Sequence, residues 1–269
     1  MESISKPFLR WAGGKNWLIK HIGGLDLSKL RSYHEPFLGG GAIFFSLKPQ
    51  KAFLSDLNGD LIDTYSAIKV DAKRVISILK TYKNTENYYY EIRHQDLTDE
   101  FERAAKFIYL NQTSFNGIYR VNLKGVYNVP FGFRNKPFIE ENKLINAQYA
   151  LKNAELTTCD FYEIVKNIKR NDLVFLDPPY TVSHNKNGFI KYNEKIFQLQ
   201  DQYRLSSLID EIKRKDAYYI LTNAAHTIID EIFDKGDIKI ELKRASLIGG
   251  HNSVRGNTTE FIFTNTKVF

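Results

Sequence analysis

The stretch LVFLDPPY, residues 173 to 180, brings a carboxylate, two prolines and an aromatic ring to the end of an apolar run. The four apolar residues predict a buried strand that ends at Asp177, and ligands in open parallel sheets bind beyond the carboxyl ends of strands. Pro178 and Pro179 fix the backbone and donate no hydrogen bond, so rigid carbonyl acceptors result. With the flat ring of Tyr180, this pattern suits a planar ligand that carries an amino group, such as adenine. A proline turn without chemistry is the alternative.

A second candidate site is the glycine turn FLGGGA, residues 37 to 42. A short strand reaching Phe37, three glycines and a helix from Ala42 predict a nucleotide-binding corner, where helix N–H groups favour electronegative atoms. Asp56 follows Gly39 by 17 residues, at the end of the strand predicted over 52–58, where an acid binds ribose hydroxyl groups. The alternatives are a plain glycine turn and an aspartate that caps the following helix.

Residues 106 to 138 contain no Asp or Glu, and we call them the acid-free block. They hold five Lys or Arg, eight Phe or Tyr and five Asn, which are the residue types that meet phosphates, stack on bases and bind base edges. The block therefore indicates a nucleic-acid contact, with a structural Tyr- and Asn-rich loop as the alternative. A second acid-free run over 243–259 indicates either another contact surface or a surface loop.

The 269-residue chain is 43% hydrophobic and carries a net charge of +7, which suits a folded protein with a polyanionic partner or simply a basic, soluble surface. Cys159 is the only cysteine, so no disulfide framework or thiol zinc site can form. The six histidines lack ligand spacing, and we expect no metal. The N-terminal residues lack the apolar stretch of a signal peptide, and no apolar run approaches the ~20 residues of a membrane span, so we expect a cytoplasmic protein.

Strand-like and helix-like segments alternate along most of the chain, which predicts an α/β fold. Helical patterns run from Leu61 to about Tyr109, over 140–153 and over 205–215. Strand patterns cover 154–161 and 217–223, and the segments 238–247 and 259–266 predict a closing β-hairpin. A helix is also predicted over 162–169. The acid-free block interrupts the alternation, which places it in an insert.

Six ordered motifs together resemble the Dam family of DNA adenine-N6 methyltransferases. They are RWAGGK (10–15), EPFLGGGAIF (35–44), LSDLN (54–58), NGIYRVNLKGVYNVPFG (116–132), CDF (159–161) and DPPY (177–180). The resemblance covers nearly the whole chain. It implies a Rossmann-like methyltransferase sheet with a mostly helical DNA-recognition insert and a β-hairpin. The implied domains are 1–58 with 147–269 for catalysis and 59–146 for target recognition.

The resemblance implies S-adenosylmethionine as the cofactor. Trp11 and Lys15 would lie along its methionine end, and the glycines of the turn would wrap it. Asp56 would bind its ribose, and Asp160 with Phe161 its adenine. The implied cofactor-binding residues are Trp11, Lys15, Phe37, Gly39, Gly40, Gly41, Asp56, Asp160, Phe161 and Asp177. The implied catalytic residues, which would hold the target adenine, are Asp177, Pro178, Pro179 and Tyr180.

Double-stranded DNA is the partner that the resemblance implies, with no obligate protein partner and no membrane. Phe115 falls where the family places a base-stacking wedge, Arg120 where it places a guanine reader, and Arg10 where it places a basic residue for the other guanine of GATC. The implied DNA-binding residues are Arg10, Phe115, Asn116, Ile118, Arg120, Asn122, Lys124, Pro130 and Arg134. Phe133 departs from the basic residue that the family often has there, and 246–257 also differs from the common pattern.

The expected activity is methyl transfer from S-adenosylmethionine to the N6 atom of an adenine rotated out of duplex DNA, with GATC as the first candidate sequence. Three alternatives stay open. The acceptor could be RNA adenine or cytosine N4, the chain could bind DNA without catalysis, or the glycine corner could serve a nicotinamide dehydrogenase. The motifs do not distinguish restriction-modification from genome marking, or a bacterial from a phage origin.

Overall fold

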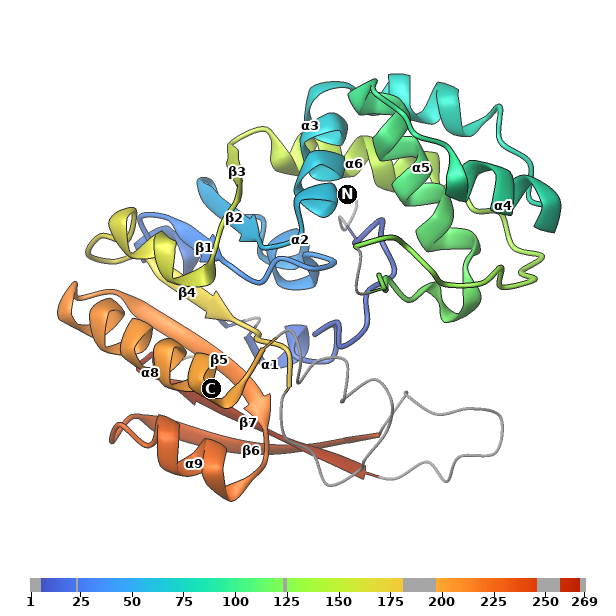
Figure 1. Ribbon diagram of the computed structural model, residues 1–269. Coiled ribbons are helices and arrows are strands. Elements are labelled where there is room, and N and C mark those ends of the chain that lie inside the picture. Colours follow the sequence, from blue (N-terminus) through green and yellow to red (C-terminus); the bar gives the residue numbers. More distant parts are fainter. Residues whose placement is uncertain (1–5, 23, 123–124, 181–196, 246–256, 267–269) are drawn as a thin grey trace. The chain divides into compact units, whose positions relative to one another are not determined.

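The computed structural model describes residues 6–22, 24–122, 125–180, 197–245 and 257–266 (Figure 1). Its strands follow the order β3-β2-β1-β4-β5-β7-β6 in a seven-stranded sheet. The chain divides into two compact units, which we describe separately. Unit 1 comprises Met1–Leu25 and Leu38–Cys159, and unit 2 comprises Asp26–Phe37 and Asp160–Phe269.

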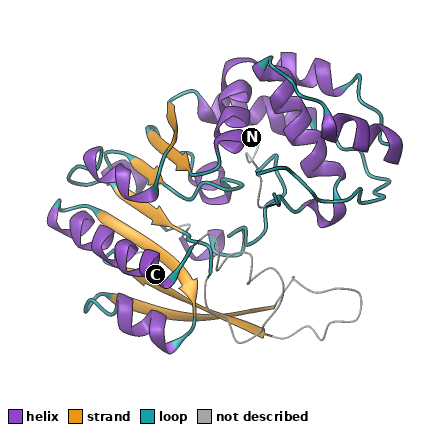
Figure 2. Cartoon of the chain, viewed as in Figure 1, coloured by secondary structure: helices purple, strands orange, loops and turns teal. Residues whose placement is uncertain are grey.

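Unit 1 joins a pair of strands to a group of helices (Figure 2). Its elements are α1 (Ile19–Ile22), α2 (Ala42–Leu47), β2 (Ala52–Asp56), α3 (Gly59–Leu79), α4 (Glu86–His94), α5 (Glu100–Thr113), the 3-10 helix η2 (Phe115–Gly117), α6 (Glu141–Leu151) and β3 (Ala154–Thr158). β2 and β3 are parallel, with Asp56 opposite Thr158. The first turn of α2 begins at Ala42 as predicted, after Gly41 in a left-handed conformation.

The helices of unit 1 form because each has a defined start and an apolar face. Asn58 caps α3 by accepting a hydrogen bond from the Leu61 N–H, and Asp99 caps α5 by accepting from Phe101 and Glu102. Apolar residues three and four apart on both helices are buried, and α3 packs against α5 and α6. The helical pattern predicted from Leu61 to about Tyr109 is therefore confirmed as the three helices α3, α4 and α5.

Unit 2 holds the parallel strands that carry DPPY and the antiparallel hairpin. Its elements are the 3-10 helix η1 (Leu27–Lys29), β1 (Tyr33–Glu35), the 3-10 helix η3 (Phe161–Lys166), β4 (Leu173–Leu176), α8 (Leu199–Arg214), β5 (Tyr218–Ala224), α9 (Thr227–Phe233), β6 (Ile238–Ala245) and β7 (Asn257–Thr264). β4 is parallel to β1 and β5, whereas β7 is antiparallel to both β5 and β6. The predicted β-hairpin is confirmed.

One apolar core holds the sheet of unit 2 together. Val174 and Leu176 of β4 pack in a buried cluster with residues of η3, α8, α9, β5 and β7. All four residues of β4 are buried, which explains why the strand reads as an unbroken apolar run. This packing fixes the end of β4, and therefore the start of DPPY, against its neighbouring strands.

The α/β fold class is confirmed, and two local predictions are wrong. The first strand ends at Glu35 rather than Phe37. Residues predicted as an α-helix over 162–169 form the 3-10 helix η3, which ends at Lys166. The α-helical bond from the Lys169 N–H to the Val165 carbonyl is not made, because that N–H donates to Asp172 and the carbonyl accepts from the Lys215 ammonium. The predicted domain boundaries stay a prediction, and α6 runs across the one at 146/147. Within the described ranges, no helix has both the length and the apolar character to cross a membrane.

Candidate functional site

The glycine turn of unit 1 is closed around the Trp11 side chain. Gly39 and Gly41 both have positive φ angles, of 47° and 65°. A Cβ atom at Gly39 would lie 2.7 Å from the Trp11 ring, and one at Gly40 would lie 3.0 Å from the Trp11 Cβ. The glycines are therefore needed for the indole to approach the backbone, in addition to any ligand. The Tyr65 hydroxyl donates to the Gly39 carbonyl over 3.1 Å and fixes the turn from the other side.

Asp56 ties the end of β2 to this turn. Its Oδ2 accepts from the Gly39 N–H over 3.0 Å, and its Oδ1 accepts from the Asn58 N–H over 3.0 Å. Burial raises the pKa of Asp56, and the backbone hydrogen bonds offset part of that effect. The sequence left open that Asp56 caps the following helix, but the residue that caps α3 is Asn58. The carboxylate therefore lies at the glycine turn, and its binding of ribose stays a prediction.

The RWAGGK motif is held by the acid-free block within unit 1. The Trp11 ring stacks on Tyr119 with centroids 5.7 Å apart, and Tyr119 stacks on Phe107 at 5.1 Å. Lys15 is 3% exposed, and its ammonium donates to the Gly13 carbonyl over 3.0 Å. The sequence did not indicate that Tyr119 would support the tryptophan.

Arg10 is fixed by the same block. Its backbone N–H donates to the Asn111 side chain over 2.8 Å, and its carbonyl accepts from it over 2.7 Å. A Cβ atom at Gly117 would lie 2.4 Å from the Arg10 guanidinium carbon, so this glycine is required for the contact. Burial, followed by the nearby charge of Arg134, lowers the pKa of Arg10. The Nη1 atom of Arg10 is buried and has no hydrogen-bond partner among the described residues.

In unit 2, Asp177 directly follows β4, as predicted, and a neighbouring strand orients its carboxylate. The Thr222 hydroxyl of β5 donates to Asp177 Oδ1 over 2.8 Å. Thr222 is fully buried. Pro178 is also buried, while Asp177 is partly exposed. The carboxylate thus stands at the carboxyl end of a buried parallel strand with its plane restrained.

Tyr180 is anchored in the same way from another strand. Its hydroxyl donates to Glu260 Oε2 over 2.6 Å, and Glu260 lies fully buried on β7. A second acid lies on β1, where the Tyr33 hydroxyl donates to Glu35 over 2.7 Å. Burial, Glu35 and Asp177 together raise the pKa of Tyr33 well above its ordinary value. Sequence reasoning missed Thr222 and Glu260, whose only signal is a polar residue inside an apolar strand.

Asp160, Phe161 and Phe37 are brought together in unit 2. The rings of Phe37 and Phe161 stack with centroids 5.2 Å apart. Asp160 Oδ1 accepts from the Tyr162 N–H over 2.9 Å and from Arg204 over 2.7 Å. The Arg204 guanidinium also lies 4.8 Å from the centre of the Phe161 ring. Arg204 was not predicted, because it reaches this place from α8.

Three of the predicted DNA-binding residues, Phe115, Asn116 and Arg120, are exposed in the acid-free block. Phe115 is 54% exposed, Asn116 has a positive φ of 57°, and Arg120 donates to the Asn128 side chain over 2.9 Å. Arg134 donates to the Gln112 carbonyl over 3.2 Å.

Three other predicted DNA-binding residues make hydrogen bonds within the acid-free block, and a fourth lies outside the described residues. Asn122 accepts from the Val126 N–H over 3.0 Å and so closes a turn. The Pro130 carbonyl accepts from Phe115, and the Ile118 N–H donates to the Phe115 carbonyl. Lys124 lies outside the described residues, as does most of the second acid-free run.

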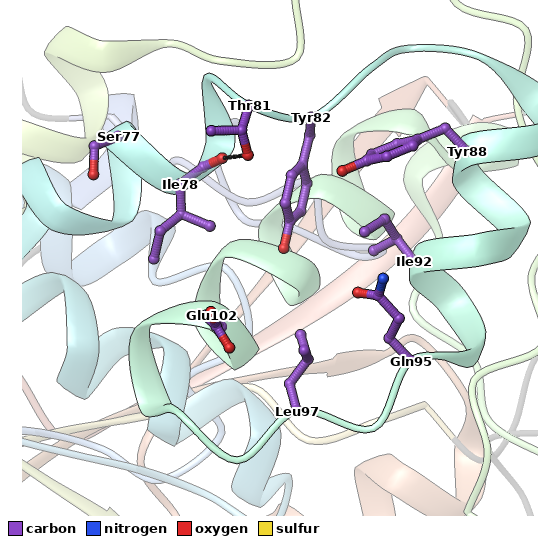
Figure 3. Close-up of a pocket in the computed structure, with 9 residues that line it drawn as sticks. All are labelled: Ser77, Ile78, Thr81, Tyr82, Tyr88, Ile92, Gln95, Leu97 and Glu102. Carbon is purple, nitrogen blue, oxygen red and sulfur yellow. Dashed lines mark hydrogen bonds between the residues drawn. The ribbon is translucent and has the colours of Figure 1, made fainter.

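A cavity of about 400 Å³ lies elsewhere in unit 1, among α3, α4 and α5 (Figure 3). It is lined by Ser77, Ile78, Thr81, Tyr82, Tyr88, Ile92, Gln95, Leu97 and Glu102. This lining contains one carboxylate, no lysine or arginine, and none of the predicted site residues. We therefore assign the cavity no part in binding cofactor or phosphate.

Comparison with known proteins identifies a family for the chain as a whole. A family profile described as D12 class N6 adenine-specific DNA methyltransferase matches residues 11–246. The chain is 36% identical to the Type II methyltransferase M1.LlaDCHI of Lactococcus lactis subsp. cremoris, over 97% of this chain and 95% of that protein. It is 32% identical to a DNA adenine methylase of Haemophilus influenzae, over 87% and 85% of the two chains. For a DNA adenine methylase of Escherichia coli K12 the identity is 29%, over 90% and 89%.

Proposed function

Because the chain belongs to the D12 class of N6 adenine-specific DNA methyltransferases, we propose that it methylates an adenine rotated out of duplex DNA, with GATC as its target sequence and S-adenosylmethionine as the methyl donor. Adenine-specific methyl transfer to DNA follows from membership of this class. The target sequence, the rotation of the base out of the helix and the roles of individual residues are what we propose.

The anchoring of DPPY is the observation that carries this proposal. Asp177 is restrained by Thr222 of β5, and Tyr180 is restrained by Glu260 of β7. A carboxylate and an aromatic ring are thereby held by separate buried partners at the end of β4. Such fixed placement is what positioning an amino group and a purine plane requires.

Asp177 and the Pro178 carbonyl would accept hydrogen bonds from the two N–H groups of adenine N6. In free adenine the N6 lone pair is delocalised into the ring, so the nitrogen is a poor nucleophile. Two acceptors outside the ring plane favour a tetrahedral nitrogen and localise the lone pair. Once methylated, N6 becomes acidic, so Asp177 can accept the released proton without being a strong base.

Tyr180 would stack on the target base after it leaves the helix. Its hydroxyl is bound to Glu260, so the ring cannot rotate freely and presents one plane. Removing a base from the stack costs a few kcal/mol, which stacking on an aromatic side chain helps to offset.

The residues predicted for the cofactor fit S-adenosylmethionine, which when bound supplies a methyl group on a positively charged sulfur. The stacked pair of Phe37 and Phe161 offers an apolar face for an adenine ring. Both bonds to Asp160 end on Oδ1, so Oδ2 can accept from an amino group. The Asp56 carboxylate accepts backbone N–H groups from Gly39, Asn58 and Leu57, and a carboxylate, which has about four acceptor positions, can accept a further bond from a ribose hydroxyl.

The direct test incubates the protein with labelled S-adenosylmethionine and two duplexes that differ only in whether they contain GATC. We expect label on N6 of the GATC adenine, located by nuclease digestion and mass spectrometry. Label on cytosine N4, or on RNA but not on DNA, would overturn the acceptor assignment. Equal labelling of both duplexes would overturn the GATC assignment alone.

A further inference from the structure

Phe133 combines two features that rarely occur together in a folded protein. Its side chain is 69% exposed, and its backbone has a φ of 50°. The left-handed region is strained for a bulky residue that is not glycine. The chain therefore holds a large apolar ring towards solvent at a strained position, which stability alone does not favour.

The backbone around Phe133 is fixed by the neighbouring segment of unit 1. The Gly132 N–H donates to the Thr113 carbonyl over 2.8 Å, and the Phe115 N–H donates to the Pro130 carbonyl over 2.9 Å. A Cβ atom at Gly132 would lie 2.5 Å from the Ser114 carbonyl oxygen, so the two backbones are in direct contact. The exposed Phe115 and Phe133 therefore belong to two segments that hold one another in place.

The ring of Phe133 also has a pedestal. It meets Phe131 edge-on, with centroids 5.0 Å apart and planes at 69°. Phe131 is 6% exposed and in turn contacts Tyr89 at 5.4 Å. One edge of the Phe133 ring is supported from the core, while most of its surface stays available to a ligand.

From these contacts we propose that Phe133 stacks on a base or sugar of bound DNA, as a second aromatic contact beside the segment that carries Phe115. The surroundings favour a nucleic acid over an apolar protein partner, since the acid-free block contains no carboxylate and Arg134 directly follows Phe133. This inference rests on the proposed function, and its test measures binding separately from methyl transfer.

The test compares three variants of the full chain: Phe133→Ala, Phe133→Trp and Phe133→Gly. Binding to a fluorescein-labelled GATC duplex is measured by anisotropy over a series of salt concentrations, and the Kd values are compared at one of them. Loss of a stacking side chain is expected to weaken the Kd by about 5- to 150-fold in the Ala and Gly variants, and Trp should stay near wild type. The salt dependence should be unchanged, because no phosphate contact is lost.

The Gly variant separates a DNA contact from a structural role. Glycine adopts a φ of 50° without strain, so its Tm should equal or exceed that of the Ala variant while its DNA affinity is just as weak. A DNA affinity within twofold of wild type for Phe133→Ala would overturn the inference. So would a loss of affinity in both variants that is matched by a fall of Tm in both.

Tyr149→Ala is the matched control, since Tyr149 is 74% exposed on α6, outside the acid-free block. Its DNA affinity should stay at the wild-type value, and an equal loss would show a general effect of exposed rings. Normal DNA affinity for Phe133→Ala with full adenine methylation would defeat this inference and leave the proposed function intact. A wild-type protein that does not methylate adenine in DNA would defeat the proposed function instead.

Discussion

The end of β4 and the acid-free block differ in how their functional side chains are held. Asp177 and Tyr180 bind the side chains of Thr222 and Glu260, which are both fully buried on neighbouring strands. Phe115 in η2 and Phe133 in an irregular segment instead have more than half of each side chain exposed. Their backbones are fixed while their rings are left open. The groups that would act on the substrate amino group are thus restrained by buried side chains, and the two phenylalanines that would contact DNA are restrained mainly at the backbone.

The charges of the two regions differ as well. Glu35 on β1 and Glu260 on β7 are buried carboxylates of unit 2, which carries DPPY, whereas the block from 106 to 138 has no carboxylate. DNA phosphates are attracted to the block, and carboxylates near DPPY favour amino groups and positive charge. Substitutions at Asp177, Glu260 and Arg120 test the difference between the end of β4 and the acid-free block. A substitution at Asp56, for which the smallest effect is expected, tests the glycine turn.

At the end of β4, Asp177→Ala should have the largest effect on turnover. We expect kcat to fall at least about 10²-fold, because the acceptor for N6 is removed, while DNA affinity and Tm change little. Single-turnover transfer of labelled methyl groups measures this, with anisotropy and thermal unfolding as the controls. Near-normal turnover in a folded variant would contradict the mechanism.

Substitutions of Glu260 test whether this residue orients the Tyr180 ring at the end of β4. In Glu260→Ala the Tyr180 hydroxyl loses a buried acceptor, and we expect a stability loss of about 1–3 kcal/mol. Turnover should also fall, because the ring is no longer oriented. Glu260→Gln keeps an acceptor and should recover most of the turnover. If kcat of the Ala variant is unchanged after correction for the folded fraction, Glu260 only stabilises the fold.

Arg120→Ala tests the exposed side through sequence discrimination. We expect it to lose about 1–3 kcal/mol of preference at one base pair of the target and to keep a normal Tm. Competition between GATC and singly substituted duplexes measures the effect. Arg103→Ala is the control, since Arg103 is an exposed arginine of α5 outside the block, paired with Asp63. An equal loss on every duplex would mean that Arg120 contacts phosphate.

Asp56 lies at the end of β2 and is bound to the glycine turn, and its substitution should have the smallest effect. Its pKa is raised in the folded state, so between the ordinary value of 3.8 and the raised value the folded chain binds more protons than the unfolded chain. Its contribution to stability is therefore present at low pH and is lost as the pH rises through the raised pKa. Urea unfolding across that range should show a shallower decline in Asp56→Asn. Identical slopes for variant and wild type would contradict this assignment.

Local patterns predicted the elements that carry the motifs. The helix start at Ala42, the end of β2 at Asp56 and the end of β4 at Leu176 all follow from runs and turns within a few residues. A helix was predicted after Asp160, but its 3-10 type and its end at Lys166 were not. The Lys215 ammonium, which binds the Val165 carbonyl, is 50 residues away in the sequence.

The supporting residues could not be predicted in the same way. Thr222, Glu260 and Arg204 act on residues that lie 45, 80 and 44 positions away, and only strand pairing and helix packing bring them together. For Phe133 the sequence offers a departure from a family pattern, but exposure and backbone conformation depend on the folded chain.

The contact at Gly132 has a consequence for anyone who wishes to redirect this enzyme to a new target. A side chain there would meet the Ser114 carbonyl oxygen at 2.5 Å, and backbone atoms cannot swing aside. At Gly117 the φ of 63° strains any other residue, and a side chain would also displace the guanidinium of Arg10. A library for altered specificity can therefore randomise Phe115, Arg120 and Phe133, but it should leave Gly117 and Gly132 constant.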